Sequence, residues 1–308
     1  SLFVRPDLNT GKTEPQETEE PTDPVEEIDW GEGTRPRSDG ERKSQDYYTV
    51  LILGRDTGGG GNTDTMLLAS YDVTNQKATV MSIPRDTMVN VSWDIKKIIS
   101  VYNWYGGGDR GIQYLYKEIA QLVGFEPDYQ VVVEWDAVGQ IVDAMGGVWF
   151  DVPRNMNYDD PYQDLHIHQE KGYRLLTGDD AMQVLRYRHD NDMRYGYPDG
   201  DLGRIKTQQA FLKAVAQQTL QVSNLTKVDE FVKIFQQYVE TDLTLGNLAW
   251  LGSKAISIGA ENVAFSTLPG EWKSPYIYLN KEETLTLVNE HLNPYVEDRV
   301  AEDLNIPD

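Results

Sequence analysis

A short apolar run that ends in a glycine-rich, acidic loop constrains this chain more than any other segment. Residues 48–53 are almost continuously apolar and rich in β-branched side chains, which predicts a strand covered on both faces. Polar residues follow at once, with a first acid at Asp56, then four glycines, then a second acid at Asp64. The chain therefore places two carboxylates close in sequence to the end of a buried strand.

Two further strands are predicted after this loop. Residues 66–71 and 79–83 have strand composition, and the turn-forming residues 73–76 between them predict a hairpin. Pro84 has no N–H to donate to a sheet, so the second strand should end there and deliver Arg85 at its end. Acids and an arginine around a glycine-rich loop indicate a site for an anionic, metal-bound group. For any one of these residues, a hairpin tip with incidental charges is the simpler interpretation.

The glycine-rich loop matches neither of two common nucleotide-binding motifs. No Gly-Lys-Ser/Thr follows the glycines, as a Walker A motif requires. A predicted strand rather than a helix comes next, which does not fit a dinucleotide-binding fingerprint.

The rest of the chain predicts an α/β fold with a largely parallel or mixed sheet. Residues 109–123 have the spacing of an amphipathic helix, and Gly124 is placed to end it. Residues 153–172 are polar and irregular. The other predicted elements are strands over residues 129–134, 148–152 and 263–268, and helices over residues 135–145, 205–221, 227–238, 245–258 and 282–291.

An aromatic loop precedes the first predicted helix. Tyr102, Trp104 and Tyr105 are followed by three glycines. These rings can stack on sugar rings beside a cleft, or they can support the loop from beneath, which is the commoner role.

Composition excludes several functions. The formal net charge of −22 argues against a nucleic-acid partner, which would need a basic face to neutralise phosphates. The chain has no cysteine, so it has no disulfide, thiolate zinc site or thiol nucleophile. No apolar run approaches the roughly 18 to 20 residues that span a bilayer. The chain begins with Ser1 rather than Met, which fits the loss of an upstream signal or anchor segment.

Composition also divides the chain in two. Residues 1–46 contain thirteen acidic and six basic residues, several prolines and few large apolar side chains, which predicts a flexible acidic linker. An acidic peptide that docks on a partner or folds over a basic site is the functional alternative. Residues 47–308 are predicted to form the catalytic domain.

A second informative cluster covers residues 177–209. Thr177 or Asp179 can cap a short helix that runs through Val184. Strand-like alternation after it would aim Arg186 and Arg188 the same way, toward an anion between them. The alternative is a pair of salt bridges to Asp190, Asp192 or Asp199.

A helix is predicted to begin close to Asp201. Arg204 and Gln208 would lie one turn apart on the same face of this helix. The partial positive charge of the helix start would also favour a phosphate there. Asp201 itself is at a position where an aspartate more often acts only as a cap.

His166 and His168 would lie on one side of a strand. A zinc site would need a third ligand, and the sequence does not show one clearly. We therefore expect an exposed histidine pair on a surface hairpin.

Five short motifs follow one another along the chain, at residues 53–56, 63–65, 82–86, 185–189 and 203–209. In this order they resemble the LytR-CpsA-Psr family. The resemblance covers about residues 48–220, and residues 267–278 resemble the closing segment of the family. It implies a three-layer α/β/α domain with a central mixed sheet. It also implies attachment to the outer face of the cytoplasmic membrane of a Gram-positive-type bacterium, through an N-terminal helix absent from this chain.

The resemblance implies a phosphotransferase that moves a glycopolymer, of the teichoic acid or capsule type, from a polyprenyl pyrophosphate carrier to peptidoglycan. Asp56 and Asp64 would hold magnesium, or alternatively manganese, against the pyrophosphate. Asp201 would be the candidate base for the acceptor hydroxyl. The pyrophosphate oxygens would be bound by Arg85, Arg186, Arg188 and Arg204, with Gln208 beside them; of these, Arg85 and Arg204 would also act in catalysis.

Two departures from the family pattern bear on the site. Family members commonly have an arginine directly after the first aspartate, where this chain has Thr57, and Arg55 precedes the aspartate instead. The loop between Arg188 and Arg204 also carries an insertion at residues 193–198, which can reshape the acceptor entrance or be a neutral surface insertion.

Three other functions compete with this interpretation. Asp56-Thr57-Gly58 matches the tripeptide of the aspartic proteases, but that class is all-β and has no use for the later arginines. A pyrophosphatase for the same lipid carriers would use the same site with water as the nucleophile. A binding or regulatory protein would hold the lipid-linked glycan without turnover.

Overall fold

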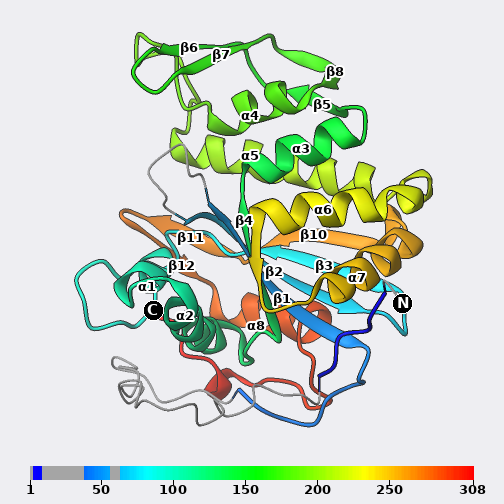
Figure 1. Ribbon diagram of the computed structural model, residues 1–308. Coiled ribbons are helices and arrows are strands. Elements are labelled where there is room, and N and C mark those ends of the chain that lie inside the picture. The colour runs from blue at the N-terminus through cyan, green and yellow to red at the C-terminus, as the bar shows by residue number, and fades with distance from the viewer. Residues whose placement is uncertain (1–2, 9–37, 56–62) are drawn as a thin grey trace, which may run out of the picture. The chain divides into compact units, whose positions relative to one another are not determined.

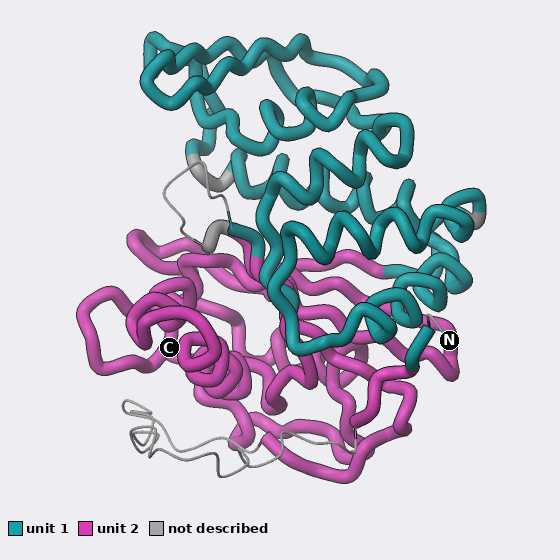
Figure 2. The backbone as a smooth tube through the Cα atoms, in the orientation of Figure 1, with its two compact units in different colours: residues 1–4, 54–63, 131–263 teal, residues 5–53, 64–130, 264–308 magenta. Residues whose placement is uncertain are grey.

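The computed structural model describes residues 3–8, 38–55 and 63–308, except for the side chains of Thr63, Asp64, Asp201, Leu202 and Val222. Two compact units divide the chain, and Figure 2 colours them separately. Unit 1 comprises residues 1–4, 54–63 and 131–263, and unit 2 comprises residues 5–53, 64–130 and 264–308. Among the described residues, every helix is too short or too polar to span a bilayer.

A mixed six-stranded sheet confirms the predicted sheet (Figure 1). The first predicted strand is buried on both faces, since the consecutive residues Tyr48 and Thr49 are both fully buried. The predicted hairpin pairs Leu67 with Ser82 and Asp72 with Lys77, and its second strand ends before Pro84 as expected. The strand order is β10 (Val263–Thr267), β3 (Lys77–Ser82), β2 (Thr63–Asp72), β1 (Tyr47–Arg55), β4 (Tyr129–Glu134) and β9 (Val239–Thr241).

Unit 2 adds helices to its strands. The predicted amphipathic helix is confirmed as α2 (Gly108–Val123), which buries Leu115, Ile119 and Leu122. Gly124 ends it with a φ of 79°, a left-handed conformation that favours glycine. The other elements of this unit are α1 (Ile98–Trp104), β11 (Gly270–Lys273), β12 (Tyr276–Leu279) and α8 (Lys281–His291).

Unit 1 is built mainly from helices and two small hairpins. Helix α4 (Gly178–Arg186) packs against α3 (Asp136–Ala144) and α5 (Asp201–Thr219). Its core includes Trp135, Phe150, Tyr187 and Phe211, with the two phenylalanine rings edge to face at 5.1 Å. The remaining elements are β5 (Val148–Val152), β6 (Met156–Asp160), β7 (Leu165–Gln169), β8 (Gly172–Leu176), α6 (Val228–Tyr238) and α7 (Leu245–Ile258).

Two parts of unit 1 differ from the sequence prediction. Strand β5 does not join the six-stranded sheet and pairs instead with β8, with Val148 opposite Leu176. Its residues alternate between buried and exposed, which is the pattern of a hairpin with one buried and one solvent-exposed face. Residues 153–172 also contain strands β6 and β7, and each strand has few buried apolar residues, so the pattern is weak in sequence.

Residues near both ends of the predicted linker pack against the rest of unit 2. Pro6 is buried, and its carbonyl accepts a hydrogen bond from the Tyr48 hydroxyl at 3.0 Å. The Arg299 side chain, only 1% exposed, donates to the Asp39 carbonyl at 2.6 Å. The described parts of this segment, residues 3–8 and 38–46, thus include positions packed on the body of the protein.

The Asp128 carboxylate connects three segments of unit 2 through hydrogen bonds. Its two carboxylate oxygens each accept a hydrogen bond from the Arg42 guanidinium at 2.8 Å. One of these oxygens also accepts from the Thr49 amide at 2.9 Å and from the Thr49 hydroxyl at 3.0 Å. The Arg42 and Asp128 side chains are only 19% and 15% exposed, so water replaces these bonds poorly. The carboxylate therefore joins residue 42, strand β1 and the start of β4.

We expect Asp128→Ala to lower the free energy of unfolding by about 2–4 kcal/mol, because it leaves a half-buried guanidinium and a buried amide without their acceptor. Denaturant melts followed by circular dichroism would measure the loss. Lys273→Ala is a matched control, since it removes two surface contacts, an ion pair to Glu271 at 3.8 Å and a cation–π contact 5.4 Å from the Tyr278 ring centroid, and should shift stability by less than about 1 kcal/mol. Equal effects of the two substitutions would contradict the fastening role of Asp128.

Candidate functional site

The residues predicted to form the site are divided between the two units. Arg186, Arg188, Arg204 and Gln208 belong to unit 1, and Arg85 belongs to unit 2. Asp56 lies outside the described residues. Asp64 is the second residue of β2 and Asp201 is the first residue of α5, and the description of both stops at the backbone.

Helix α4 is fixed at its start by a capping box. The Thr177 hydroxyl accepts from the Asp180 amide at 3.1 Å, and the Asp180 carboxylate accepts from the Thr177 amide at 3.0 Å. This confirms Thr177 as the cap. Gly178 allows the close approach of α3, because a Cβ built there would lie 2.2 Å from the Gly139 carbonyl oxygen. The helix is thereby held along α3 before it reaches Arg186 at its last position.

Helix α5 contacts the other end of α4. Arg204 and Gln208, one turn apart, are only 5% and 4% exposed, so the prediction that they share a face of one helix is confirmed. The Gln208 side-chain amide donates a hydrogen bond of 3.0 Å to the carbonyl of Leu185, the residue before Arg186. That carbonyl is one of the helix-terminal acceptors that α4 itself cannot satisfy. Gln208 therefore fixes the backbone that presents Arg186.

The expected strand-like alternation at Arg186 and Arg188 is wrong. Arg186 is still helical, whereas Tyr187 is extended with φ of −65° and ψ of 133°. Tyr187 is fully buried and anchors the turn, while Arg188 is exposed. Burial raises the pKa of the Tyr187 hydroxyl, which donates to Asp190 at 2.8 Å.

The three acids considered as partners of the arginines are engaged by other groups. Asp190 accepts from Tyr187, Asp192 accepts the backbone amides of residues 194 and 195, and Asp199 pairs with Lys206 at 3.4 Å. These amides lower the pKa of Asp192. The Arg186 guanidinium instead lies 3.5 Å from Asp136, at the start of α3. Asp136 is fifty positions away in sequence and carries no local signal of this pairing.

Arg85 follows β3 in a tightly bonded turn. Thr87, which is fully buried, donates to the Pro84 carbonyl from its amide at 3.0 Å and its hydroxyl at 2.6 Å. The Arg85 carbonyl accepts from the Ile99 amide at 3.3 Å, and Asp86 pairs with Lys97 at 3.1 Å. These bonds fix the backbone at Arg85 within unit 2.

Two aromatic side chains of the inserted loop after Arg188 contact a cation from another part of unit 1. The Arg154 guanidinium lies 4.4 Å from the Tyr195 ring centroid and 5.6 Å from that of Tyr197. The backbone of His189 bridges to Gly196, which closes the loop. No local sequence pattern marks Arg154 as a partner of this loop, because Arg154 lies more than thirty positions earlier in the chain, just before β6.

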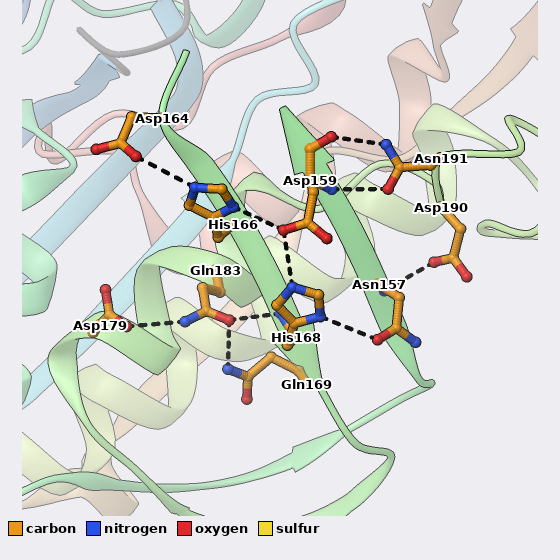
Figure 3. A network of polar contacts seen from close by, with 10 residues as sticks. All are labelled: Asn157, Asp159, Asp164, His166, His168, Gln169, Asp179, Gln183, Asp190 and Asn191. Atoms are coloured by element: carbon orange, nitrogen blue, oxygen red, sulfur yellow. Dashed lines mark hydrogen bonds and ion pairs between the residues drawn. The ribbon is translucent and has the colours of Figure 1, made fainter. Parts of the chain in front are cut away.

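The histidine pair is exposed on a hairpin, as expected (Figure 3). His166 and His168 come from β7, and both imidazoles approach the same oxygen of Asp159 on β6, at 2.7 and 2.9 Å. Within the part of the chain that the structure describes, no group of three or more His, Cys, Asp or Glu side chains has the arrangement of a metal site. The hydrogen bond that His166 donates to the Asp159 carboxylate raises the pKa of His166, and the two histidines lower the pKa of Asp159.

Comparisons with known proteins agree on one family. The model of the LytR_cpsA_psr family matches residues 7–294. The regulatory protein MsrR of Staphylococcus aureus strain COL is 24% identical over 259 residues, which cover 82% of this chain and 74% of that protein. The polyisoprenyl-teichoic acid–peptidoglycan teichoic acid transferase TagU of Bacillus cereus is 32% identical over 200 residues, which cover 64% of this chain and 60% of that protein.

A solved structure extends this agreement to the fold. The crystal structure of TagV from B. subtilis matches with a TM-score of 0.64 and 22% identity, and covers 82% of this chain and 100% of that one. The likeness confirms the predicted α/β fold.

We expect the His166 imidazole to titrate above the ordinary value of about 6.5, because its protonated form is bonded to Asp159. A raised folded-state pKa means that this pair stabilises the fold at low pH and that the contribution is lost as the pH rises through that pKa. NMR titration of the imidazole would measure it, and Asp159→Asn should move the midpoint back down. Asp160→Asn is the control, since Asp160 bonds the backbone amide of Tyr162 instead. An unchanged midpoint in Asp159→Asn would refute the pairing.

Proposed function

This chain belongs to the LytR-CpsA-Psr family, and we propose that it transfers a glycopolymer of the teichoic acid type from a polyprenyl pyrophosphate carrier to peptidoglycan. The observation that carries the proposal is the junction of α4 and α5. There, buried Arg204 shares a helix face with Gln208, and Gln208 binds the carbonyl beside Arg186. The similarity to TagU, which is named for this transfer, supports the choice of substrates.

In the proposed reaction the acceptor hydroxyl oxygen attacks the phosphorus that bears the glycan. A new P–O bond forms to the acceptor, and the bond from that phosphorus to the bridging oxygen breaks. Polyprenyl phosphate leaves with the bridging oxygen, and the glycan becomes joined to peptidoglycan through a phosphodiester. The hydroxyl proton passes to a base, for which Asp201 is the candidate.

The chain's arginines would supply the electrostatic part of this chemistry. Phosphoryl transfer is catalysed mainly by positioning and by neutralising charge on the phosphate oxygens. A guanidinium stays charged at every physiological pH and presents paired N–H donors to phosphate. We assign Arg85, Arg186, Arg188 and Arg204 to these oxygens, and Gln208 to positioning of Arg186.

Magnesium belongs to this proposal as the cofactor. Two carboxylates, Asp56 and Asp64, are a donor set of the kind that Mg²⁺ takes together with phosphate oxygens and water. When bound, the ion would neutralise charge on the pyrophosphate. The proposed location is the outer face of the cytoplasmic membrane, where peptidoglycan is accessible.

A binding or regulatory role is the second candidate, favoured by the similarity to a relative named regulatory protein MsrR. Incubation of the protein with a polyprenyl-pyrophosphate glycan and peptidoglycan fragments, followed by mass spectrometry, separates the candidates. A glycan-phosphate-peptidoglycan product supports transfer. Free glycan phosphate supports the pyrophosphatase alternative, and retained binding without any product supports the regulatory role.

Arg186→Ala and Arg85→Ala should each lower turnover by about a hundredfold or more, because each removes a guanidinium charge that is proposed to stabilise the transferring phosphoryl group. The rates would be compared in the mass-spectrometric assay, with circular dichroism to check folding. Arg5→Ala is the matched control, since it removes an arginine that pairs with Asp46 at 2.7 Å and is half-exposed. Near-normal turnover in both site variants would count against this site.

Removal of the metal should stop transfer. We expect EDTA to abolish product formation and added Mg²⁺ to restore it, with Mn²⁺ as the alternative ion. Asp64→Asn should raise the Mg²⁺ concentration needed for half-maximal turnover, because it removes one of the two proposed carboxylate ligands. Full turnover in EDTA would disprove the assignment of magnesium.

A further inference from the structure

A ladder of aromatic rings in unit 2 ends at an exposed tryptophan. The Trp104 ring stacks on the Trp93 ring, with centroids 4.6 Å apart and planes 12° from parallel. Trp93 meets Tyr105 edge to face at 5.8 Å, and Tyr105 stacks on Tyr114 at 3.6 Å. Trp93 and Tyr114 are only 8% and 2% exposed, whereas Trp104 is 60% exposed. One face of the Trp104 indole is thus backed by a buried ring while most of its surface remains in water.

The ring beneath Trp104 is held in place by hydrogen bonds. The Trp93 indole N–H donates to the Ser100 hydroxyl at 2.9 Å. That hydroxyl lies 2.7 Å from the Lys97 carbonyl, so it can donate onward while it accepts. The Arg110 guanidinium lies 5.9 and 5.7 Å from the ring centroids of Tyr105 and Tyr114. Trp104 therefore rests on a preorganised base, which lowers the entropy cost of binding a ligand to it.

The backbone next to Trp104 is open to an approaching molecule. Gly106, Gly107 and Gly108 all have positive φ, and a Cβ added at Gly106 or Gly108 would meet no atom within 4 Å. Asn103, Asp109 and Arg110 are exposed around this turn. The surroundings thus combine an exposed indole with hydrogen-bond donors and acceptors.

We propose that Trp104 is a stacking platform for a sugar ring in the glycan strand of peptidoglycan. A pyranose has an apolar face of C–H groups that can cover an indole, and its hydroxyl and acetamido groups can bond to polar residues at the ring's edge. Asn103, Asp109 and Arg110 are exposed within six positions of Trp104 in sequence, and their side chains include both donors and acceptors. The inference rests on the proposed function, because it assigns the acceptor of that reaction to this surface.

Charge favours the uncharged glycan strand over the anionic glycopolymer as the occupant. Asp109 and Arg110 are adjacent in sequence and have opposite charges, so together they add no net charge to this segment. The whole chain has a formal net charge of −22, which opposes binding of a polyanion outside a local cationic site. A neutral sugar avoids this repulsion and still gains the stacking contact.

The test is a binding titration of the whole chain with a neutral β-1,4-linked N-acetylglucosamine tetramer, followed by NMR of the tryptophan indole N–H signals. We expect Trp104→Ala to weaken binding by about tenfold or more and Trp104→Phe, which keeps a flat ring, to weaken it less. Trp149→Ala is the matched control, because Trp149 is 48% exposed and also stacks on an aromatic ring, that of Tyr173 at 5.4 Å. The affinity of this variant for the tetramer should equal that of the unaltered chain.

Unchanged affinity in Trp104→Ala would overturn the proposal, as would an equal loss in Trp149→Ala. Tighter binding of a poly(glycerol phosphate) chain than of the tetramer at Trp104 would overturn the choice of occupant. The titration needs no turnover, so its outcome is separate from that of the transferase assay. Tetramer binding lost in Trp104→Ala, with no transfer product from the unaltered chain, would support the platform and reject the proposed reaction.

Discussion

Polar side chains that close the ends of helices and strands hold the functional parts of both units in place, and the hydrogen bond from Gln208 to the Leu185 carbonyl has the most direct effect on the candidate site. A buried carbonyl at a helix end must find a donor, or the fold loses the free energy of desolvating it. Because α5 provides that donor, the position of Arg186 depends on helix packing rather than on the flexibility of a loop. In unit 2, the Asp128 carboxylate, just before β4, accepts hydrogen bonds from the Thr49 amide near the start of β1 and from Arg42, and so holds these segments together.

The charge of the protein makes this rigidity useful. A chain with a net charge of −22 does not attract phosphate polymers in general, so the proposed recognition of a pyrophosphate would rely on a few arginines in fixed positions. Arg204 is only 5% exposed, and a guanidinium that is buried to this extent interacts more strongly with an anion than one surrounded by water. A buried long cation has also lost most of its side-chain entropy on folding, so that less of this entropy would oppose binding of the proposed phosphate.

Local sequence patterns predicted the elements of the fold well where one physical signal dominated. The buried run of β1, the β2–β3 hairpin with its stop at Pro84 and the glycine-ended helix α2 all follow from periodicity and turn chemistry. Strand β5 was assigned to the wrong sheet, because its pairing with β8 depends on which residues lie nearby in space. At the candidate site, the shared helix face of Arg204 and Gln208 was predictable from their spacing. The contact of Arg186 with Asp136 was not, because it joins residues fifty positions apart.

The aromatic loop shows why sequence alone left two roles open. Both roles need flat apolar side chains, and only burial distinguishes them. Tyr102 is only 6% exposed and its hydroxyl accepts a hydrogen bond from the Gly108 amide at 3.0 Å, so the commoner role does apply to this segment, and Trp93 and Tyr114 lie buried beneath it. Trp104 has the same chemistry but most of its surface faces water, although exposure of a large indole loses the free energy that its burial would gain. The buried rings thus form the base for an exposed ring, and a ligand that covers the Trp104 indole would recover part of that free energy.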